Sequence, residues 1–428
     1  MDTRDTGAMR AFVLHPDLTG TPNRRDASMA LAEAVALAAA LPELEVAGAE
    51  VVRLQKAQPG LLFGRGKIEE LGSRFKAEDI GLVLVDGPVT PVQQRNLERE
   101  WGVKLLDRTG LILEIFADRA RTREGVLQVE LAALSYQRTR LVRAWTHLER
   151  QRGGLGFVGG PGETQIEADR RAIDEAITRI KRQLAKVTKT RALHRAARAK
   201  VPYPIVALVG YTNAGKSTLF NRMTGADVMA RDMLFATLDP TMRGVVLPTG
   251  GEIILSDTVG FISDLPTQLV AAFRATLEEV LAADLICHVR DISHPETDEQ
   301  AADVAAILAE LGVDETVPLL EMWNKIDVVP PEERAALENR ANRDENVLTL
   351  SALTGEGLDQ ALATISERLE GERRDEVVVL PYSDGRGRAW LFEQGVVKDE
   401  RQQEDGITLK VSWTPRQKAR FKALGGKD

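Results

Sequence analysis

The spacing of hydrophobic positions changes along the chain. Up to about residue 115, short apolar runs at 11–14, 50–54, 82–85 and 103–106 alternate with helical segments at 28–41, 67–75 and 92–101. Alternating strand and helix signals are typical of an α/β unit with a mainly parallel sheet. We therefore predict a small α/β domain over residues 1–116.

Residues 117–200 follow a different pattern. Leu127, Leu131 and Leu134 begin a spacing of four and three residues, which resumes after the glycine-rich stretch 153–162. Two heptad helices joined by such a loop predict an antiparallel helical hairpin. Each arm of about 22–30 residues would extend about 35–45 Å, at 1.5 Å per residue.

Strand and helix signals alternate again over residues 201–370, which predicts a second and larger α/β domain. Beyond about residue 375 only short β signals occur, at 377–380 and 407–411. We expect residues 371–428 to form a small, mostly β or α+β domain or tail.

Charge is distributed unevenly over these segments. The whole chain carries a net charge of −8, but residues 117–200 hold 19 lysines and arginines against nine aspartates and glutamates. A basic hairpin on an acidic body favours a polyanionic partner, although a solvated helical surface has the same composition.

Other compositional features point to a cytoplasmic protein. The one cysteine, Cys287, rules out an internal disulfide, and it lies in an apolar run typical of a buried strand. Five scattered histidines offer no zinc site, no apolar run approaches the about 20 residues of a membrane span, and the N-terminus lacks the layout of a signal peptide.

One glycine-rich segment fits the phosphate-binding pattern G-x-x-x-x-G-K-[ST]. It consists of Gly210, Tyr211, Thr212, Asn213, Ala214, Gly215, Lys216 and Ser217, between an apolar strand signal and a helix that begins near Thr218. Glycines allow backbone N–H groups to close on phosphate oxygens, and the helix N-terminus adds positive potential. Lys216 is expected to reach the β- and γ-phosphates, and Ser217 to ligate Mg²⁺.

Three further motifs follow in the order expected of a GTPase. The first is Asp257, Thr258, Val259 and Gly260, of which Asp257 would hold Mg²⁺ through water and Gly260 N–H would bond the γ-phosphate. The second is Asn324, Lys325, Ile326 and Asp327, whose carboxylate would accept from guanine N1–H and the 2-amino group and so reject adenine. The third is Ser351, Ala352 and Leu353, which would offer a backbone N–H to guanine O6.

The first switch segment must supply a threonine to Mg²⁺ and the γ-phosphate. The candidate segment contains Phe235, Ala236, Thr237, Leu238, Asp239, Pro240 and Thr241. Both threonines have suitable chemistry, and spacing alone does not choose between them.

Phe261 occupies the position after Gly260, where many GTPases carry a water-orienting glutamine. Because a phenyl ring does not polarise water, catalysis needs backbone groups, another side chain or a partner, and we expect slow intrinsic GTP hydrolysis. Asn213 raises a further hypothesis, that K⁺ near the phosphates supplies the missing positive charge; the other reading is a loop-stabilising amide.

The chain resembles the HflX family of translational GTPases over most of its length. The similarity rests on the phosphate loop, on residues 107–116, 120–122 and 127–131, and above all on residues 159–167 with 169–171. It favours Thr237 as the Mg²⁺ ligand and is weakest beyond residue 375. It implies an N-terminal α/β domain, a helical hairpin and a GTPase domain, with Lys216, Thr237 and Gly260 in the catalytic role.

The resemblance also implies binding of GTP and GDP and of the large ribosomal subunit, with splitting or rescue of stalled or idle ribosomes under stress. A basic hairpin suits rRNA phosphates, and its glycine-rich tip permits close approach to RNA. Arg152, Phe157 and Gln165 are the candidate RNA contacts. We expect a monomer away from the ribosome and no membrane partner.

Two other functions remain open at this point. The first is an ATP-driven remodeller of rRNA, with a second nucleotide site near the loop Gly64, Arg65, Gly66 and Lys67, although only one full phosphate-binding motif is present. The second is a GTPase switch that regulates a protein partner rather than the ribosome.

Overall fold

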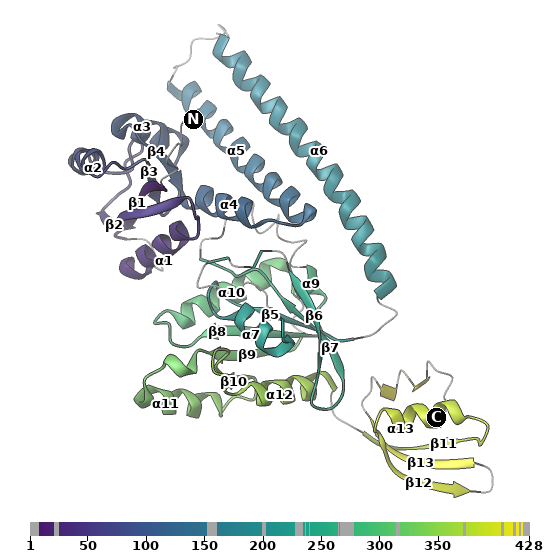
Figure 1. The fold of residues 1–428 in the computed structure, drawn as a ribbon. Helices are drawn as coiled ribbons and strands as arrows, with labels where there is room; N and C mark the ends of the chain where they lie inside the picture. The colour runs from purple at the N-terminus through teal and green to yellow at the C-terminus, as the bar shows by residue number, and fades with distance from the viewer. Residues whose placement is uncertain are drawn as a thin grey trace, which may run out of the picture.

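The computed structural model shows an α/β protein in which two sheets and a long helical hairpin are followed by a small α+β unit (Figure 1). It describes residues 8–20, 25–151, 161–198, 203–226, 234–235, 237–238, 240–263, 265, 278–313, 317–370, 374–403, 406–413, 417–418 and 421–422. None of the described helices is long and apolar enough to cross a membrane.

The N-terminal sheet is fully parallel. Its strands are β1 (Met9–Leu18), β2 (Leu44–Leu54), β3 (Leu82–Val85) and β4 (Lys104–Asp107), in the spatial order β2-β1-β3-β4. The helices that connect and cover these strands are α1 (Ala27–Ala39), α2 (Arg65–Ala77), α3 (Pro91–Trp101) and α4 (Arg108–Arg119).

Side chains of β1 alternate between the two faces of this sheet, as the period of a strand requires. Ala11 and Val13 pack in one core with residues of α1 and α4, whereas Phe12 and Leu14 pack in another with residues of α2 and α3. The face covered by α1 and α4 is also the one that meets the larger sheet.

Two long helices form the predicted antiparallel hairpin. They are α5 (Arg123–Gln151) and α6 (Pro161–Arg198), which lie side by side, with Arg138 Nε 2.7 Å from Asp174 Oδ1 between them (Figure 1). At 38 residues, α6 is longer than the arm we predicted. It begins at Pro161, so the end of the predicted glycine loop and Gln165 belong to a helix; Arg152 and Phe157 lie outside the described residues.

The second sheet has six strands in the order β10-β9-β8-β5-β7-β6, with only the β6–β7 pair antiparallel. The strands are β5 (Ile205–Val209), β6 (Thr241–Val246), β7 (Glu252–Asp257), β8 (Leu285–Asp291), β9 (Leu319–Asn324) and β10 (Val347–Thr349). The described helices around them are α7 (Lys216–Thr224), α9 (Glu278–Leu281), α10 (Thr297–Leu311), η1 (Ile326–Val328), α11 (Pro331–Ala341) and α12 (Leu358–Glu370).

The C-terminal unit has a core of its own. Its antiparallel sheet has the order β11-β13-β12, built from β11 (Arg374–Leu380), β12 (Val397–Gln403) and β13 (Gly406–Trp413), and helix α13 (Gly385–Glu393) packs beside it. The two predicted β signals lie in β11 and β13, whereas the sequence analysis missed β12 and α13.

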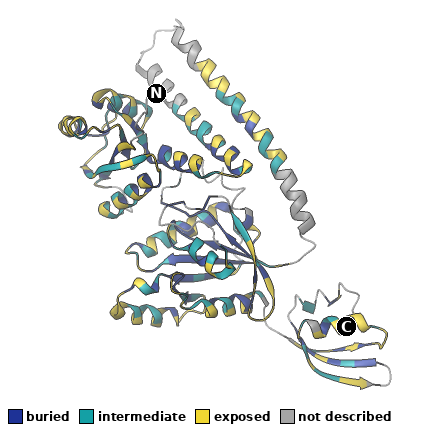
Figure 2. Ribbon diagram, in the orientation of Figure 1, coloured by how far each residue is buried: buried dark blue, intermediate teal, exposed yellow. Residues whose placement is uncertain are grey.

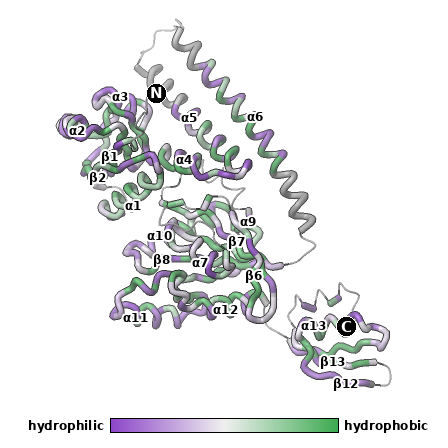
Figure 3. Tube along the Cα trace, in the orientation of Figure 1, coloured by the Kyte–Doolittle hydropathy of each residue, from purple (hydrophilic) through white to green (hydrophobic). Residues whose placement is uncertain are grey.

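Apolar packing connects the N-terminal sheet to the six-stranded one. A single hydrophobic cluster contains Ile112 and Phe116 of α4 together with Phe235, Val259 and Phe261 near the predicted phosphate site. Strands at this contact are buried and the outer helices carry the exposed residues (Figure 2). Along the described part of α6, hydrophilic and hydrophobic residues alternate in short segments (Figure 3).

Candidate functional site: a nucleotide pocket at the carboxyl end of β5

The loop between β5 and α7 has the backbone geometry of a phosphate cradle. Gly210 and Gly215 have φ values of +152° and +94°, and a Cβ on either would lie 2.2 Å from Val289 O or Asn324 Nδ2 respectively. Only glycine suits both positions, because the left-handed region and the close contact each exclude a side chain. The loop leads into the N-terminus of α7, where free N–H groups favour an anion.

Lys216 is the first residue of α7 and only 6% exposed. Its ammonium donates to Gly210 O at 3.0 Å and to Tyr211 O at 2.8 Å. Burial lowers the pKa of Lys216 to about 8, against an opposite effect of the Asp257 charge. A buried cation with this depressed pKa is stabilised by an anion in the cradle.

Three oxygen atoms converge beside this lysine. Ser217 Oγ donates to Asp257 Oδ2 at 2.7 Å, Thr237 Oγ1 donates to the same oxygen at 3.0 Å, and the two hydroxyls are 2.8 Å apart. The geometry therefore brings Thr237 into the cluster, whereas Thr241 begins β6 and pairs with Asp257 in the ladder.

The cluster has the chemistry of a site for a hard cation. Asp257 is fully buried, and among the described residues no group donates to its Oδ1. Burial raises the pKa of Asp257, while hydrogen bonds from Ser217 and Thr237 and the Lys216 charge act against that rise. Two hydroxyls and an unsatisfied carboxylate oxygen match the oxygen ligands that Mg²⁺ prefers, so these residues fit the predicted ion.

Other residues of the predicted phosphate side turn away from the cradle. Thr258 Oγ1 donates to Leu208 O at 2.6 Å, and Val259 is in the hydrophobic core, so both are available to a ligand only through their backbone. Asn213 is exposed with a φ of +59°. Ala236 and Asp239 lie outside the described residues.

Phe261 is 1% exposed and packs away from the cradle. Its backbone pairs with the phosphate loop instead, since Thr212 N donates to Phe261 O at 2.7 Å and Phe261 N donates to Gly210 O at 3.1 Å. This side chain cannot orient water, and its ring serves the packing of the switch segment.

Asn324 anchors the predicted guanine side. Its Nδ2 donates to Ala214 O at 2.8 Å, and its Oδ1 accepts from Ala352 N at 2.9 Å. One amide thereby joins the phosphate loop, the end of β9 and the Ser351 segment. Because Ala352 N–H is engaged in this way, Leu353, which is 72% exposed, is the more accessible residue of that segment.

Asp327 and Lys325 occupy the segment that follows. Asp327 is half-buried, and no described residue pairs with its carboxylate, which leaves both oxygens for a ligand. Lys325 has a φ of +66°, and its Nζ is 2.7 Å from Asp291 Oδ2, so the stem of the side chain is fixed beside the site.

The second candidate for a phosphate-binding loop, Gly64–Lys67, has a different arrangement. Gly64 is the N-cap of α2, and the Lys67 ammonium contacts the carboxylates of Glu50 and Glu70. Its charge is already balanced by neighbouring carboxylates, in contrast to that of Lys216. This loop borders an open cavity of about 1280 Å³ at the carboxyl ends of β1 and β2.

Sequence reasoning missed a set of polar contacts around Tyr211. The Tyr211 hydroxyl donates to Glu33 of α1, and Ser263 N donates to that hydroxyl at 2.9 Å. Arg108 of α4 donates to Ser263 O at 3.0 Å. The only available signal was the presence of Arg108 in a segment that resembles a family signature.

Comparisons with known proteins define the class. Successive segments match four family models, described as "GTP-binding GTPase N-terminal" (residues 28–117), "GTP-binding GTPase Middle Region" (119–198), "50S ribosome-binding GTPase" (205–325) and "HflX C-terminal domain" (336–426). Together with the site, these matches identify a P-loop GTPase of several segments.

Curated relatives give the family. A GTPase HflX of Magnetococcus marinus is 52% identical over 91% of this chain and 90% of its own length. That of Escherichia coli is 48% identical over 82% of each chain. A crystal structure of a GTP-binding protein from Sulfolobus solfataricus in complex with GDP is 23% identical, covers 84% of this chain and 99% of its own, and has a TM-score of 0.46. The chain belongs to the HflX family of GTPases, which are GTP hydrolases.

Proposed function

We propose that this protein binds GTP with Mg²⁺ at the β5–α7 loop and couples its hydrolysis to binding of the large ribosomal subunit. The observation that carries the nucleotide site is the convergence of Ser217, Thr237 and Asp257 beside the buried ammonium of Lys216. A cation site and an anion cradle side by side suit a nucleoside triphosphate with its metal ion.

Each group then has a defined task. Lys216 and the loop N–H groups hold the β- and γ-phosphates, and Gly260 N–H contacts the γ-phosphate. Ser217 and Thr237 would ligate Mg²⁺ directly and Asp257 would do so through water, and the ion would supply positive charge next to the phosphates. Asp327 reads the guanine edge, while Asn324 holds the loops that border the base.

Hydrolysis by the isolated protein is slow because the position after Gly260 supplies no group that orients water. Phe261 is buried, so a change of its rotamer does not replace the missing amide. A partner that orders the switch segments completes the site. K⁺ held near the exposed Asn213 is the second source of positive charge that we propose.

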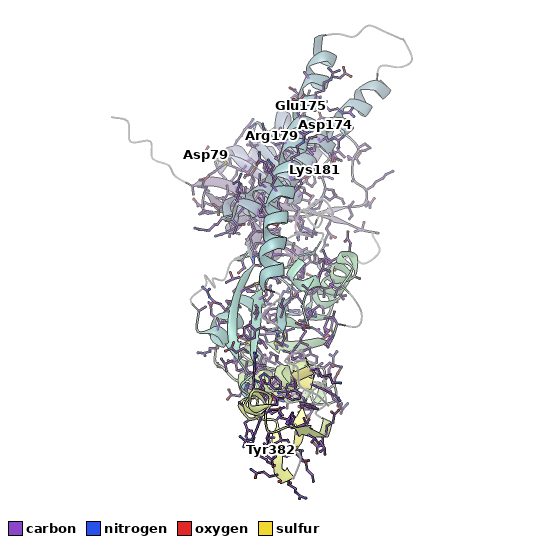
Figure 4. All side chains as sticks on the ribbon, turned by 90° about the vertical axis from the view of Figure 1, so that its right-hand side faces the viewer. Asp79, Asp174, Glu175, Arg179, Lys181 and Tyr382 are labelled. Atoms are coloured by element: carbon purple, nitrogen blue, oxygen red, sulfur yellow. The ribbon has the colours of Figure 1, made fainter. Side chains whose placement is uncertain are left out.

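The ribosome is the partner that the family relationship and the hairpin favour. One matching model is described as a "50S ribosome-binding GTPase", and the described part of α6 presents basic side chains such as Arg179 and Lys181 on its surface (Figure 4). Lysine and arginine on an exposed helix supply sequence-independent contacts to rRNA phosphates. With GTP bound, the protein splits or rescues stalled or idle ribosomes under stress, and hydrolysis releases it.

This proposal includes a division of the chain. Residues 1–116 form the N-terminal α/β domain, residues 117–200 form the hairpin that engages the subunit, residues 201–370 bind the nucleotide, and residues 371–428 add a small C-terminal unit. The protein acts in the cytoplasm, as a monomer when it is not on the ribosome. The Lys67 ion pairs argue against a second, ATP-binding loop at Gly64–Lys67.

The test is GTP turnover with and without purified large subunits, in K⁺ and in Na⁺. We expect subunits to raise turnover at least about tenfold, because they order a site that lacks its own water-orienting group. Co-sedimentation with a non-hydrolysable GTP analogue is the companion measurement. If the protein stays at the top of the gradient and large subunits do not change the rate of GTP turnover, a non-ribosomal switch is favoured.

A further inference from the structure

Helix α4 touches both switch segments of the nucleotide site, the first switch at residues 235–241 and the second switch at residues 257–263. At its first residue, Arg108 Nη2 donates to the backbone carbonyl of Ser263, three residues after Gly260, at 3.0 Å. Near its other end, the Phe116 ring packs edge-on against Phe235, with ring centroids 4.6 Å apart. One rigid helix therefore spans the two segments that flank the phosphates.

Glu33 of α1 joins these contacts to the phosphate loop. Its carboxylate accepts from Arg108, from Arg25 at 3.2 Å and from the hydroxyl of Tyr211, the second residue of the cradle. Ser263 Oγ is 2.7 Å from the same hydroxyl. The Glu33 carboxylate of α1 thus binds both Arg108 of α4 and Tyr211 of the phosphate loop, and each of these two side chains also contacts Ser263 of the second switch.

The side chains that meet around Glu33 are largely buried. Arg108 is 7% exposed and also donates to Asp86 Oδ1 at 2.6 Å. Burial alone would raise the pKa of Glu33, but Arg108, Arg25 and Tyr211 hold that pKa below its ordinary value. Removal of Arg108 takes a charged partner from two buried carboxylates, Glu33 and Asp86, so the contact tolerates little displacement.

The switches held by α4 are in a closed arrangement. Thr237 lies against Ser217 and Asp257, which is the position from which it would serve Mg²⁺. If a contact forms only in one arrangement of the switches, it strengthens the binding of any ligand that requires the same arrangement. The effect is reciprocal, because two linked equilibria share one coupling free energy.

We propose that Arg108 and Glu33 are positioning residues of the nucleotide site, which hold Ser263 and Tyr211 so that docking of the N-terminal sheet and binding of GTP strengthen each other. This inference rests on the proposed GTP site. Release of the switches after hydrolysis removes the surface on which α4 is seated.

The same helix connects to the hairpin. Asp107 immediately precedes Arg108 and caps α4 by accepting from Gly110 N at 2.9 Å. Its carboxylate also accepts from the Tyr136 hydroxyl at 2.5 and 2.6 Å and from Arg140 Nη1 at 3.0 Å, both on α5. Adjacent residues therefore face the switches and the hairpin, and movement of α4 reorients α5.

The first test compares affinities for GDP and a non-hydrolysable GTP analogue, each with Mg²⁺, in the full-length chain. In Arg108→Gln and Tyr211→Phe we expect the analogue to bind about tenfold more weakly and GDP to change by less than about twofold. Tyr211→Phe removes only a hydroxyl group, so this variant still tests the inference if Arg108→Gln does not fold. Arg74→Gln is the matched control, because its ion pairs with Glu50 and Glu78 stay within the N-terminal part.

The ratio of the two affinities separates positioning from a structural role. A lower Tm with an unchanged ratio in both variants would overturn the inference, since Arg108 and Tyr211 would then serve only packing. Wild-type protein that binds neither nucleotide would contradict the proposed function instead.

The second test follows the hairpin with spin labels at Lys181→Cys on α6 and Gln360→Cys on α12. Both positions are exposed, whereas the native Cys287 is buried, and burial raises the pKa of its thiol, so labels go to the introduced sites (Figure 4 shows Lys181). We expect the interlabel distance to differ between GDP and the GTP analogue, and Arg108→Gln to abolish that difference. Identical distances in the wild type with both nucleotides bound would refute the link to the hairpin.

Discussion

The guanine side and the phosphate side of the nucleotide site are built in different ways. On the proposed guanine side, Asn324 bonds Ala214 and Ala352, so both of these contacts come from the part of the chain that forms the six-stranded sheet. On the phosphate side, Phe235 packs on Phe116 and Ser263 is held by Arg108, both from the N-terminal sheet. The proposed base-recognition side is thus held by its own scaffold, whereas the switch segments also contact helix α4 of the N-terminal domain.

This difference has a functional consequence. If the guanine side is held only by contacts within its own domain, discrimination between bases stays constant when the other domains move. Switches that depend on another unit respond to anything that moves that unit, including a partner bound to the hairpin. The predictions below test whether the two sides are separable, beginning with the largest expected effect.

Lys216→Ala is expected to lower GTP turnover on the order of 10²–10³-fold, because it removes a preorganised cation from a buried site. Steady-state phosphate release measures the change. Lys67→Ala is the matched control, since that lysine also follows a glycine-rich loop but pairs with Glu50 and Glu70. Equal losses in the two variants would show that the Lys67 loop takes part in nucleotide chemistry.

Asp327→Asn is expected to weaken GTP and GDP alike by at least about 100-fold, because an amide group cannot accept both guanine donors. Xanthosine nucleotides, which present a carbonyl at that edge, should bind the variant better than the wild type. Competition against a fluorescent nucleotide measures both. Asp359→Asn, at an exposed position of α12, is the control. A selective loss of GTP over GDP would contradict a self-contained guanine side.

The main motifs of both sides could be predicted from the sequence. The phosphate loop and the Asn324–Asp327 motif are local patterns, each read from a strand and the residues directly after it. The structure adds that Thr237, rather than Thr241, lies beside Ser217 and Asp257. Spacing could not decide this point, because the path of a loop depends on what packs against it.

The contacts of the switches with the N-terminal sheet could not be predicted in the same way. Glu33 and Tyr211 are 178 residues apart, and neither has a distinctive local pattern. For the hairpin, a local pattern predicted the elements but not their bounds. The heptads predicted two helices, but α6 begins at Pro161, inside the glycine-rich stretch. Proline is favoured in the first turn of a helix, and Pro161 is the local signal for this helix start.

Gly260→Ala is expected to lower GTP turnover about tenfold while it leaves GDP affinity nearly unchanged. A Cβ at this position would lie 2.9 Å from Thr212 Cα and 3.2 Å from Lys216 Nζ, so the second switch must move off the phosphate loop. Turnover and GDP titration give the two values. Gly244→Ala in β6 has open space around its Cβ and is the control. A matching loss of GDP affinity would mean that the phosphate and guanine sides are not separable.

The smallest expected effect is a dependence of nucleotide affinity on pH. Burial lowers the pKa of Lys216 from 10.5 to about 8. Between these values the unfolded chain binds more protons than the folded one, so the stability of the nucleotide-free protein rises with pH in this window.

Bound phosphates favour the charged lysine, so nucleotide binding takes up a proton above pH 8. GDP affinity should fall about twofold from pH 7 to 8, because a lysine that has lost its proton must regain it when the nucleotide binds. Calorimetry in buffers of different ionisation enthalpy measures the proton uptake directly. Guanosine lacks phosphates and engages only the guanine side, so its affinity should stay flat from pH 7 to 8. A slope for guanosine equal to that for GDP would assign the titration to the guanine side and remove Lys216 as its source.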